Sequence, residues 1–369
     1  MTELSRPKGP IEPIPLTVLT GFLGAGKTTL LNRLLPNPAL AGTAVLINEF
    51  GEIGLDHLLV RKIDDGLVLL QSGCLCCTMR GDLIEALVTL LRDLDNGRCS
   101  FRRIIVETTG LADPAPVLHT TMVHPYLTLR YRLDGIITVV DAVNGLATLE
   151  SHGESVKQIA VADRIVLTKT DLAEVGAKGL IEHLRALNPA APILDVAAGQ
   201  ATPERLLDCA LYDPERKNPD VKRWLAEEAY AAAHDHHHHH HDRSRHDDHI
   251  RAFTLATDKP IPAQSLDMFL ELVRAMHGPS LLRFKGVVNV SETPDQPVVV
   301  HGVQHLLHPP TQLERWPDDD HRTRLVFITR DIEERVIRDL FGAFLGQVAP
   351  DRPDRAALLD NPLVPFGGR

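Results

Sequence analysis

The sequence predicts an α/β fold in which a parallel sheet is flanked by helices, followed by a histidine-rich linker and a small α+β domain. In the first part, short runs of Val, Ile and Leu alternate with longer amphipathic segments, which is typical of βαβ units whose sheet is buried on both faces. The composition then becomes polar and rich in histidine, and a second alternation follows. We therefore expect four segments, which are residues 14–211, 212–249, 250–346 and a loose tail at 347–369.

Each expected element rests on its local pattern of apolar residues. Short apolar runs predict strands in the first segment at residues 16–20, 44–48, 67–70, 104–107, 136–141, 165–168 and 193–196. Helices are expected between them, as at residues 83–94, where Leu83, Leu87 and Leu91 recur at helical spacing. The same reasoning predicts, in the third segment, strands at 251–256, 281–290, 298–303 and 324–329 and helices at 262–276 and 332–344.

The composition limits the function. The chain has 369 residues, 44% of them hydrophobic, which is enough for the cores of two domains. Its formal net charge of −10 argues against nucleic acid or an anionic membrane as the partner. No apolar run reaches the ~18 to 20 residues that span a bilayer, and the polar N-terminal residues do not resemble a signal peptide. We expect a cytoplasmic protein.

A glycine-rich loop follows the first expected strand. Residues 21–28, GFLGAGKT, match the pattern G-x-x-x-x-G-K-S/T, and an amphipathic helix comes next. Such a loop wraps phosphates with its backbone N–H groups, while Lys27 neutralises the β- and γ-phosphates and the Thr28 hydroxyl completes a Mg²⁺ shell. An ordinary strand-to-helix turn is the alternative, and the Lys-Thr pair in register argues against it. The expected nucleotide-binding residues here are Gly21, Gly24, Ala25, Gly26, Lys27, Thr28 and Thr29.

Two further motifs concern the nucleotide. Residues 104–110, IIVETTG, form a strand that ends in an acid and a glycine, so Glu107 is a candidate for holding Mg²⁺ and Gly110 for sensing the γ-phosphate. A strand capped by a solvated Glu is the alternative. With Lys27 and Thr28, these two residues are the candidate catalytic groups.

A guanine signature follows a later strand. Thr168, Lys169 and Asp171 fit the pattern N/T-K-x-D, in which the Asp carboxylate accepts from guanine N1–H and N2–H₂ and the Lys stem covers the ring. A site built on such hydrogen bonds discriminates against adenine by ~10⁴, so GTP is the expected nucleotide. A chance tetrapeptide is the alternative.

Three cysteines lie close together. Cys74, Cys76 and Cys77 follow the strand at 67–70, and thiolates that converge on one ion suit Zn²⁺ or Cu⁺, of which we favour Zn²⁺. Glu49 and Glu52, after the strand at 44–48, are candidates for an oxygen ligand to that ion or to Mg²⁺, and solvated loop acids are the alternative. Cys74 and Cys77 also form the pattern C-x-x-C, so a redox-active pair of cysteines is the alternative.

The order of these motifs resembles the CobW family of P-loop GTPases, which are metallochaperones and metal insertases. The resemblance extends to the third segment, notably around Leu282-Arg283-Phe284-Lys285-Gly286. It implies GTP binding at residues 24–29, 169 and 171, metal binding at the three cysteines and a nucleotide-sensing role for residues 107–110. Thr168 replaces the usual Asn of the guanine signature, and Ile47 stands where some members have a further acid, which places more weight on the thiolates.

The linker concentrates histidine. Nine of the 19 histidines lie between His234 and His249, with four aspartates among them, a composition that can collect Zn²⁺, Ni²⁺ or Co²⁺ weakly. A solvated linker without a metal role is the alternative.

Together these patterns predict a metal-delivery GTPase. GTP and Mg²⁺ would order the loops around the cysteines, and hydrolysis would release Zn²⁺, or Co²⁺, to a client apo-metalloprotein. We expect slow intrinsic turnover because no arginine finger is evident. A metal-sensing regulatory GTPase that transfers nothing is the alternative, and a metabolic P-loop kinase is disfavoured by the guanine signature. The client, the choice between zinc and cobalt, and the oligomeric state stay open at this point.

Overall fold

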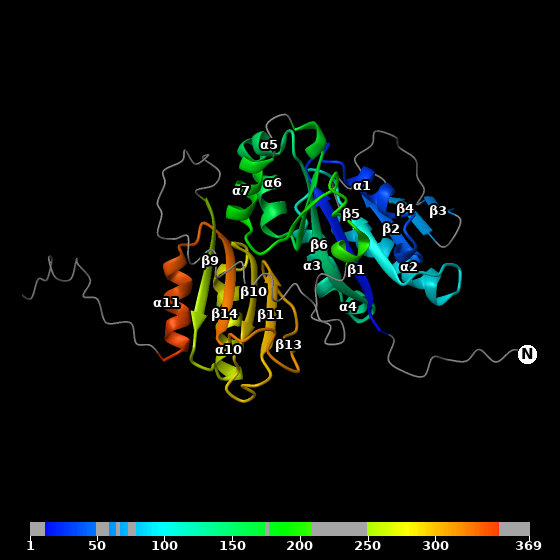
Figure 1. The fold of residues 1–369 in the computed structure, drawn as a ribbon. Helices are drawn as coiled ribbons and strands as arrows, with labels where there is room; N and C mark the ends of the chain where they lie inside the picture. Colours follow the sequence, from blue (N-terminus) through cyan, green and yellow to red (C-terminus); the bar gives the residue numbers. More distant parts are fainter. Residues whose placement is uncertain are drawn as a thin grey trace, which may run out of the picture.

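The structure is a computed structural model that describes residues 12–48, 59–63, 67–72, 79–173, 177–207 and 249–346. The three clustered cysteines and the acids at positions 49 and 52 lie outside these residues, as do the histidine run before His249 and the expected tail. Figure 1 shows two sheets side by side, each with its own helices. None of the helices in the described ranges is long and apolar enough to cross a membrane.

The first sheet has eight strands in the order β3-β4-β2-β5-β1-β6-β7-β8, and all but the edge strand β3 run parallel. Its strands are β1 (Ile14–Gly21), β2 (Thr43–Asn48), β3 (Leu59–Ile63), β4 (Leu67–Ser72), β5 (Arg103–Glu107), β6 (Tyr131–Asp141), β7 (Arg164–Thr168) and β8 (Ile193–Asp195). Its helices are α1 (Lys27–Leu34), η1 (Pro38–Leu40), α2 (Met79–Asp95), α3 (Ala115–Val123), α4 (Pro125–Arg130), α5 (Gly145–Ser151), α6 (Gly153–Ala160), η2 (Thr170–Leu172), α7 (Lys178–Leu187) and α8 (Pro203–Leu206).

The predicted fold class is confirmed, with two differences in the strands. The strand β3 was not expected, because its sequence LVRKI lacks a clear apolar run. The strand β6 begins five residues earlier than the apolar run at 136–141, in a stretch that contains Asp134. That carboxylate is fully buried and accepts hydrogen bonds from Thr17 and Arg103, both at 2.8 Å. Such long-range pairing lets a charged residue sit inside a strand.

The second sheet is antiparallel and has the order β12-β11-β10-β14-β9, with β13 beside β11. Its elements are β9 (Ile250–Thr257), α10 (Ala263–His277), β10 (Leu281–Val288), β11 (Val298–Val303), β12 (Leu306–Leu307), β13 (Thr311–Gln312), β14 (Thr323–Arg330) and α11 (Glu334–Phe344). Aromatic rings join this sheet to its helices, since Phe269 of α10 contacts Phe327, Phe341 and Phe344. The small α+β domain expected from the sequence is therefore confirmed.

The two domains share an apolar contact. Leu282, Val303 and Ile328 of the second sheet belong to the same buried cluster as Leu133 and Val161 of the first domain. Helices α6 and α7 lie on the side of the first domain that faces the second sheet, against β10 and β9 respectively (Figure 1).

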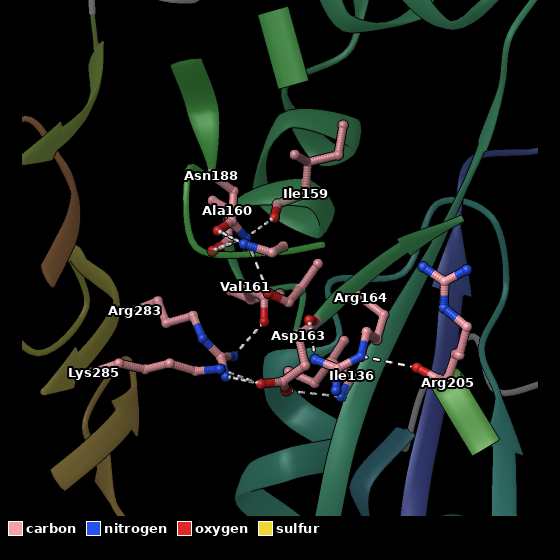
Figure 2. Close-up of polar contacts among 12 residues, drawn as sticks. Ile136, Ile159, Ala160, Val161, Asp163, Arg164, Asn188, Arg205, Arg283 and Lys285 are labelled. Carbon is pink, nitrogen blue, oxygen red and sulfur yellow. Dashed lines mark hydrogen bonds and ion pairs between the residues drawn. The ribbon is translucent and has the colours of Figure 1, made fainter. Parts of the chain in front are cut away.

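A buried charge cluster completes the domain contact (Figure 2). Asp163, which precedes β7, is ion-paired with Arg283 and with Lys285 of β10, the latter at 2.7 Å. Burial alone would raise the pKa of Asp163, but the two cations outweigh burial and hold the pKa below its usual range. Burial also lowers the pKa of Lys285, an effect that Asp163 opposes. The carboxylate is therefore the compensating charge for two cations of the second domain.

Candidate nucleotide site

The phosphate loop is built where β1 meets α1. The strand ends at Gly21 and the helix begins at Lys27, with Gly21, Gly24 and Gly26 at φ angles of 141°, 73° and 92°. Side chains strongly disfavour these angles, and a Cβ on Gly21 would lie 2.3 Å from the carbonyl oxygen of Val139. Glycine is therefore needed both for the turn and for its close contact with β6.

Lys27 lies over the loop that it follows. Its Nζ atom donates to the carbonyl oxygens of Gly21 at 2.9 Å and Phe22 at 3.3 Å. The ammonium group is thus held beside the backbone that is expected to wrap the phosphates. This position suits a cation that contacts the β- and γ-phosphates.

Glu107 lies beside the loop although it is distant in sequence. Strands β1 and β5 pair in parallel, with Leu19 opposite Glu107, so the carboxylate reaches the start of α1. There the Thr28 hydroxyl donates to Glu107 Oε1 at 2.6 Å, and the Glu107 side chain is only 3% exposed. A hydroxyl and a buried carboxylate in contact form an oxygen donor set that fits Mg²⁺.

The turn after β5 packs directly on the phosphate loop. A Cβ on Gly110 would lie 2.5 Å from the backbone nitrogen of Leu23 and 2.7 Å from its Cα. Just before these two residues in each segment, the Thr108 hydroxyl donates to the Thr20 hydroxyl at 2.9 Å. The turn is consequently placed to respond to changes in the loop, and the loop to changes in the turn.

The guanine signature is also tied to the phosphate loop. The Thr168 hydroxyl donates to the carbonyl oxygen of Ala25 at 2.7 Å, so the threonine that replaces the usual asparagine still links the two segments. Lys169 has a left-handed φ of 58°, and its Nζ donates to Gly24 O at 2.9 Å and to Asp141 Oδ2 at 2.7 Å. Asp171 follows in η2 with an exposed side chain, as a base-binding carboxylate requires.

Two acids of this region were not singled out from the sequence. Asp141 ends β6 and binds Lys169; burial alone would raise the pKa of Asp141, but the Lys169 hydrogen bond and its other donors lower the pKa overall. Asp195 ends β8 and accepts from the Thr170 hydroxyl at 2.7 Å and from the Ala197 backbone N–H at 2.8 Å. An aspartate that closes a buried strand is the signal in the sequence that could have identified both.

The candidate metal ligands are approached through the strand register. Strands β2 and β4 pair in parallel, and their last residues, Asn48 and Ser72, lie opposite each other. The segments that carry the two acids and the three cysteines therefore begin at the carboxyl ends of two adjacent strands. Beside them, Ile47 pairs with Glu107. Among the described residues, no group of three or more His, Cys, Asp or Glu side chains is placed to hold a metal ion.

These features define a P-loop nucleotide-binding protein with an appended α+β domain, and comparison with known proteins gives its family. The CobW/HypB/UreG nucleotide-binding domain matches residues 15–195, and the cobalamin synthesis protein CobW C-terminal domain matches residues 250–345. The chain belongs to the CobW family of P-loop GTPases.

Individual relatives are similar over different lengths. The Escherichia coli protein zinc chaperone YjiA is 33% identical over 332 residues, which cover 90% of this chain and 98% of that protein. The Schizosaccharomyces pombe zinc-regulated GTPase metalloprotein activator 1 is 37% identical over 198 residues, 52% of this chain and 47% of that protein. The crystal structure of zinc-bound YjiA GTPase from E. coli is similar with a TM-score of 0.65 and 29% identity, covering 90% of this chain and 99% of that one.

The contact between Gly110 and Leu23 gives a first testable prediction. Gly110→Ala should lower the rate of GTP hydrolysis about a hundredfold, because a displacement near 1 Å at a reacting centre has an effect of that size. Gly179→Ala is the matched control, since a Cβ there meets no atom within 4 Å. Phosphate release by both purified variants would be measured. Equal rates for Gly110→Ala and wild type would show that the turn does not need its close contact with the loop.

Proposed function

We propose that the protein is a GTP-hydrolysing metallochaperone. It binds Zn²⁺, or Co²⁺, at Cys74, Cys76 and Cys77 and passes the ion to a client apo-metalloprotein. The single observation that supports this most is the register of β2, β4 and β5, because Asn48 pairs with Ser72 and Ile47 pairs with Glu107. The thiolate segment therefore follows a strand that only β2 separates from β5, which carries the acid that contacts Thr28.

The nucleotide half of the proposal rests on the site geometry. Lys27 binds the β- and γ-phosphates, and Asp171 selects guanine. Thr28 and Glu107 hold Mg²⁺, which when bound offsets the negative charge of the phosphates. Gly110 follows the position of the γ-phosphate through its contact with Leu23. These residues together bind GTP, orient it and exchange a signal with the turn at residues 110–112.

The metal half follows from the coupling of neighbouring segments. Bound GTP favours the arrangement in which the thiolates converge, with Glu49 or Glu52 adding an oxygen ligand, and hydrolysis relaxes that arrangement. Coupling between two bound ligands is reciprocal, so Zn²⁺ must tighten GTP by the factor that GTP tightens Zn²⁺. The thiols must stay reduced for this role, which is a reason to expect a cytoplasmic location.

Zinc affinity measured with and without nucleotide tests the proposal. A chelator competition should give at least about fivefold tighter Zn²⁺ binding with a non-hydrolysable GTP analogue than with GDP. The variant in which Cys74, Cys76 and Cys77 are changed together to Ser should lose this site. The control is Cys99→Ser, because the Cys99 thiol contacts the backbone carbonyl oxygen of Leu90 in α2 at 3.9 Å and is not one of the three clustered cysteines. Identical zinc affinities in both nucleotide states would refute the coupling.

A regulatory GTPase that only senses metal is the second candidate, because the second domain offers a separate body for binding another protein. The two candidates differ in what happens to the ion. A metallochaperone loaded with one equivalent of Zn²⁺ should activate an apo-metalloenzyme while a chelator scavenges free zinc. A sensor should leave that enzyme inactive under the same conditions.

A further inference from the structure

One end of helix α6 is held by the second domain. The Arg283 guanidinium group of β10 donates to the carbonyl oxygen of Val161, immediately after the helix, and to the Asp163 carboxylate. Figure 2 shows Arg283 and Lys285 reaching this end from the second sheet. The Asn188 side-chain amide donates a hydrogen bond to the nearby carbonyl oxygen of Ile159 at 2.7 Å. A cation at the C-terminal end of a helix is also favoured by the helix dipole.

The same helix holds the turn that follows β5. Gln158 is fully buried, and its Nε2 donates to the carbonyl oxygens of Gly110 at 3.2 Å and Ala112 at 3.0 Å. The backbone of Gln158 is itself held in place, because its carbonyl oxygen accepts a hydrogen bond from the Thr138 hydroxyl at 2.7 Å. A single side chain thus satisfies two backbone carbonyl groups of the turn that also contacts Leu23.

Space beside Gln158 allows this contact to change. A cavity of about 250 Å³ lies between the phosphate loop, the end of β6, α5 and α6, and Gln158 lines it together with Gly24 and Lys169. The Oε1 atom of Gln158 has no hydrogen-bond partner. The amide is therefore anchored to the turn and not to the cavity wall, so a shift of the helix moves the turn.

We propose that α6 couples the seating of the second domain to the nucleotide-sensing turn. Gln158 is the positioning residue for residues 110–112, and Arg283 is the anchor in the second domain. Val161 is three positions after Gln158, which is less than one turn of helix, so displacement at one contact reaches the other with little loss. This inference rests on the proposed function, because it assumes that the turn senses the γ-phosphate.

A ratio of nucleotide affinities separates positioning from simple destabilisation. Gln158→Met removes both donors at nearly constant length, and should reduce the preference for a non-hydrolysable GTP analogue over GDP by about tenfold, the effect of losing such hydrogen bonds. GDP affinity should stay at the wild-type value, because the Gln158 amide donates to the turn at Gly110 and Ala112, which is expected to sense the γ-phosphate that GDP lacks. A protein that was merely destabilised would lose affinity for both nucleotides.

Arg283→Met tests the role of the second domain. We expect it to reduce the preference for the GTP analogue over GDP by about fivefold. Arg324→Met is its matched control: Arg324 is similarly buried, at 7% against 4%, but pairs with Asp318 within the second domain. In the double variant, Arg283→Met should add little to Gln158→Met, because the link is already broken.

Three outcomes would overturn the inference. An unchanged preference in Gln158→Met would remove the positioning role. Equal losses in Arg283→Met and Arg324→Met would reduce the anchor to a stability effect. Full additivity in the double variant would place the coupling elsewhere, for example at the contact between His119 of α3 and His305, whose rings lie 4.9 Å apart. A wild-type protein that shows no preference for the GTP analogue would instead count against the proposed function.

Discussion

Asp171→Asn is expected to lower GTP affinity by about 10³- to 10⁴-fold, the range for a site that reads a base through paired hydrogen bonds. In the proposed site the carboxylate would accept from two guanine donors, whereas the amide of Asn would present a donor to one of them. Xanthine carries a carbonyl oxygen where guanine has its amino group, so the variant should bind xanthosine triphosphate better than GTP. Competition against a fluorescent nucleotide would measure both affinities.

The control for this change is Asp95→Asn. Asp95 is an acid of the same domain that pairs with Arg130 at 2.7 Å, away from the phosphate loop. It should leave the preference for guanine unchanged. A wild-type ratio of GTP to xanthosine triphosphate affinity in Asp171→Asn would show that the signature at 168–171 does not read the base.

Asp163→Asn should reduce the free energy of unfolding by about 3–5 kcal/mol, because it leaves buried cations without their counter-charge. Arg283 and Lys285 are both ion-paired with this carboxylate at the domain contact. Asp95→Asn again serves as the control, since Asp95 is 45% exposed and an exposed pair contributes less than about 1 kcal/mol. Urea unfolding of the three proteins at pH 7 would measure these differences. Equal stability of the Asp163 and Asp95 variants would mean that the domain contact does not depend on the buried charges.

The pH dependence of this effect has a definite sign. The pKa of Asp163 is lower in the folded protein than in the unfolded chain, where it has the ordinary value of 3.8. Its stabilisation is therefore complete above that unfolded value and is lost as the pH falls towards the folded pKa. The difference in unfolding free energy between wild type and Asp163→Asn should be constant above about pH 5 and shrink below about pH 4.

Much of the first domain could be predicted from its sequence because its central strands, β1, β5, β6 and β7, are buried on both faces. Such strands are continuous apolar runs, and seven strands of the first sheet were recognised without any knowledge of their partners. The strand β3 and the first residues of β6 were missed because charged residues interrupt the pattern. At Asp134 the charge is compensated by partners that include Thr17 and Arg103, which come from other strands.

The nucleotide motifs were also visible in the sequence, since each is a short contiguous segment that carries its own chemistry, in backbone N–H groups for the phosphate loop and in side chains for the guanine signature. The phosphate loop and the guanine signature are of this kind, and the structure brings them together through Thr168 and Ala25. Gln158 was missed because no local pattern marks it, and Asp141 and Asp195 are marked only by their place at the end of a strand. Their roles arise from partners that lie far along the chain.

The sequence by itself therefore determined the family, seven of the eight strands of the first sheet and the motifs that are expected to meet a guanine nucleotide. Only the tertiary structure decided which of these residues touch. Thr28 and Glu107 are 79 positions apart, Gln158 and Gly110 are 48 apart, and Arg283 and Asp163 are 120 apart. The physical reason is that strands which are neighbours in the sheet need not be neighbours in the sequence. Contacts across the sheet and between the domains therefore depend on packing that no single segment encodes.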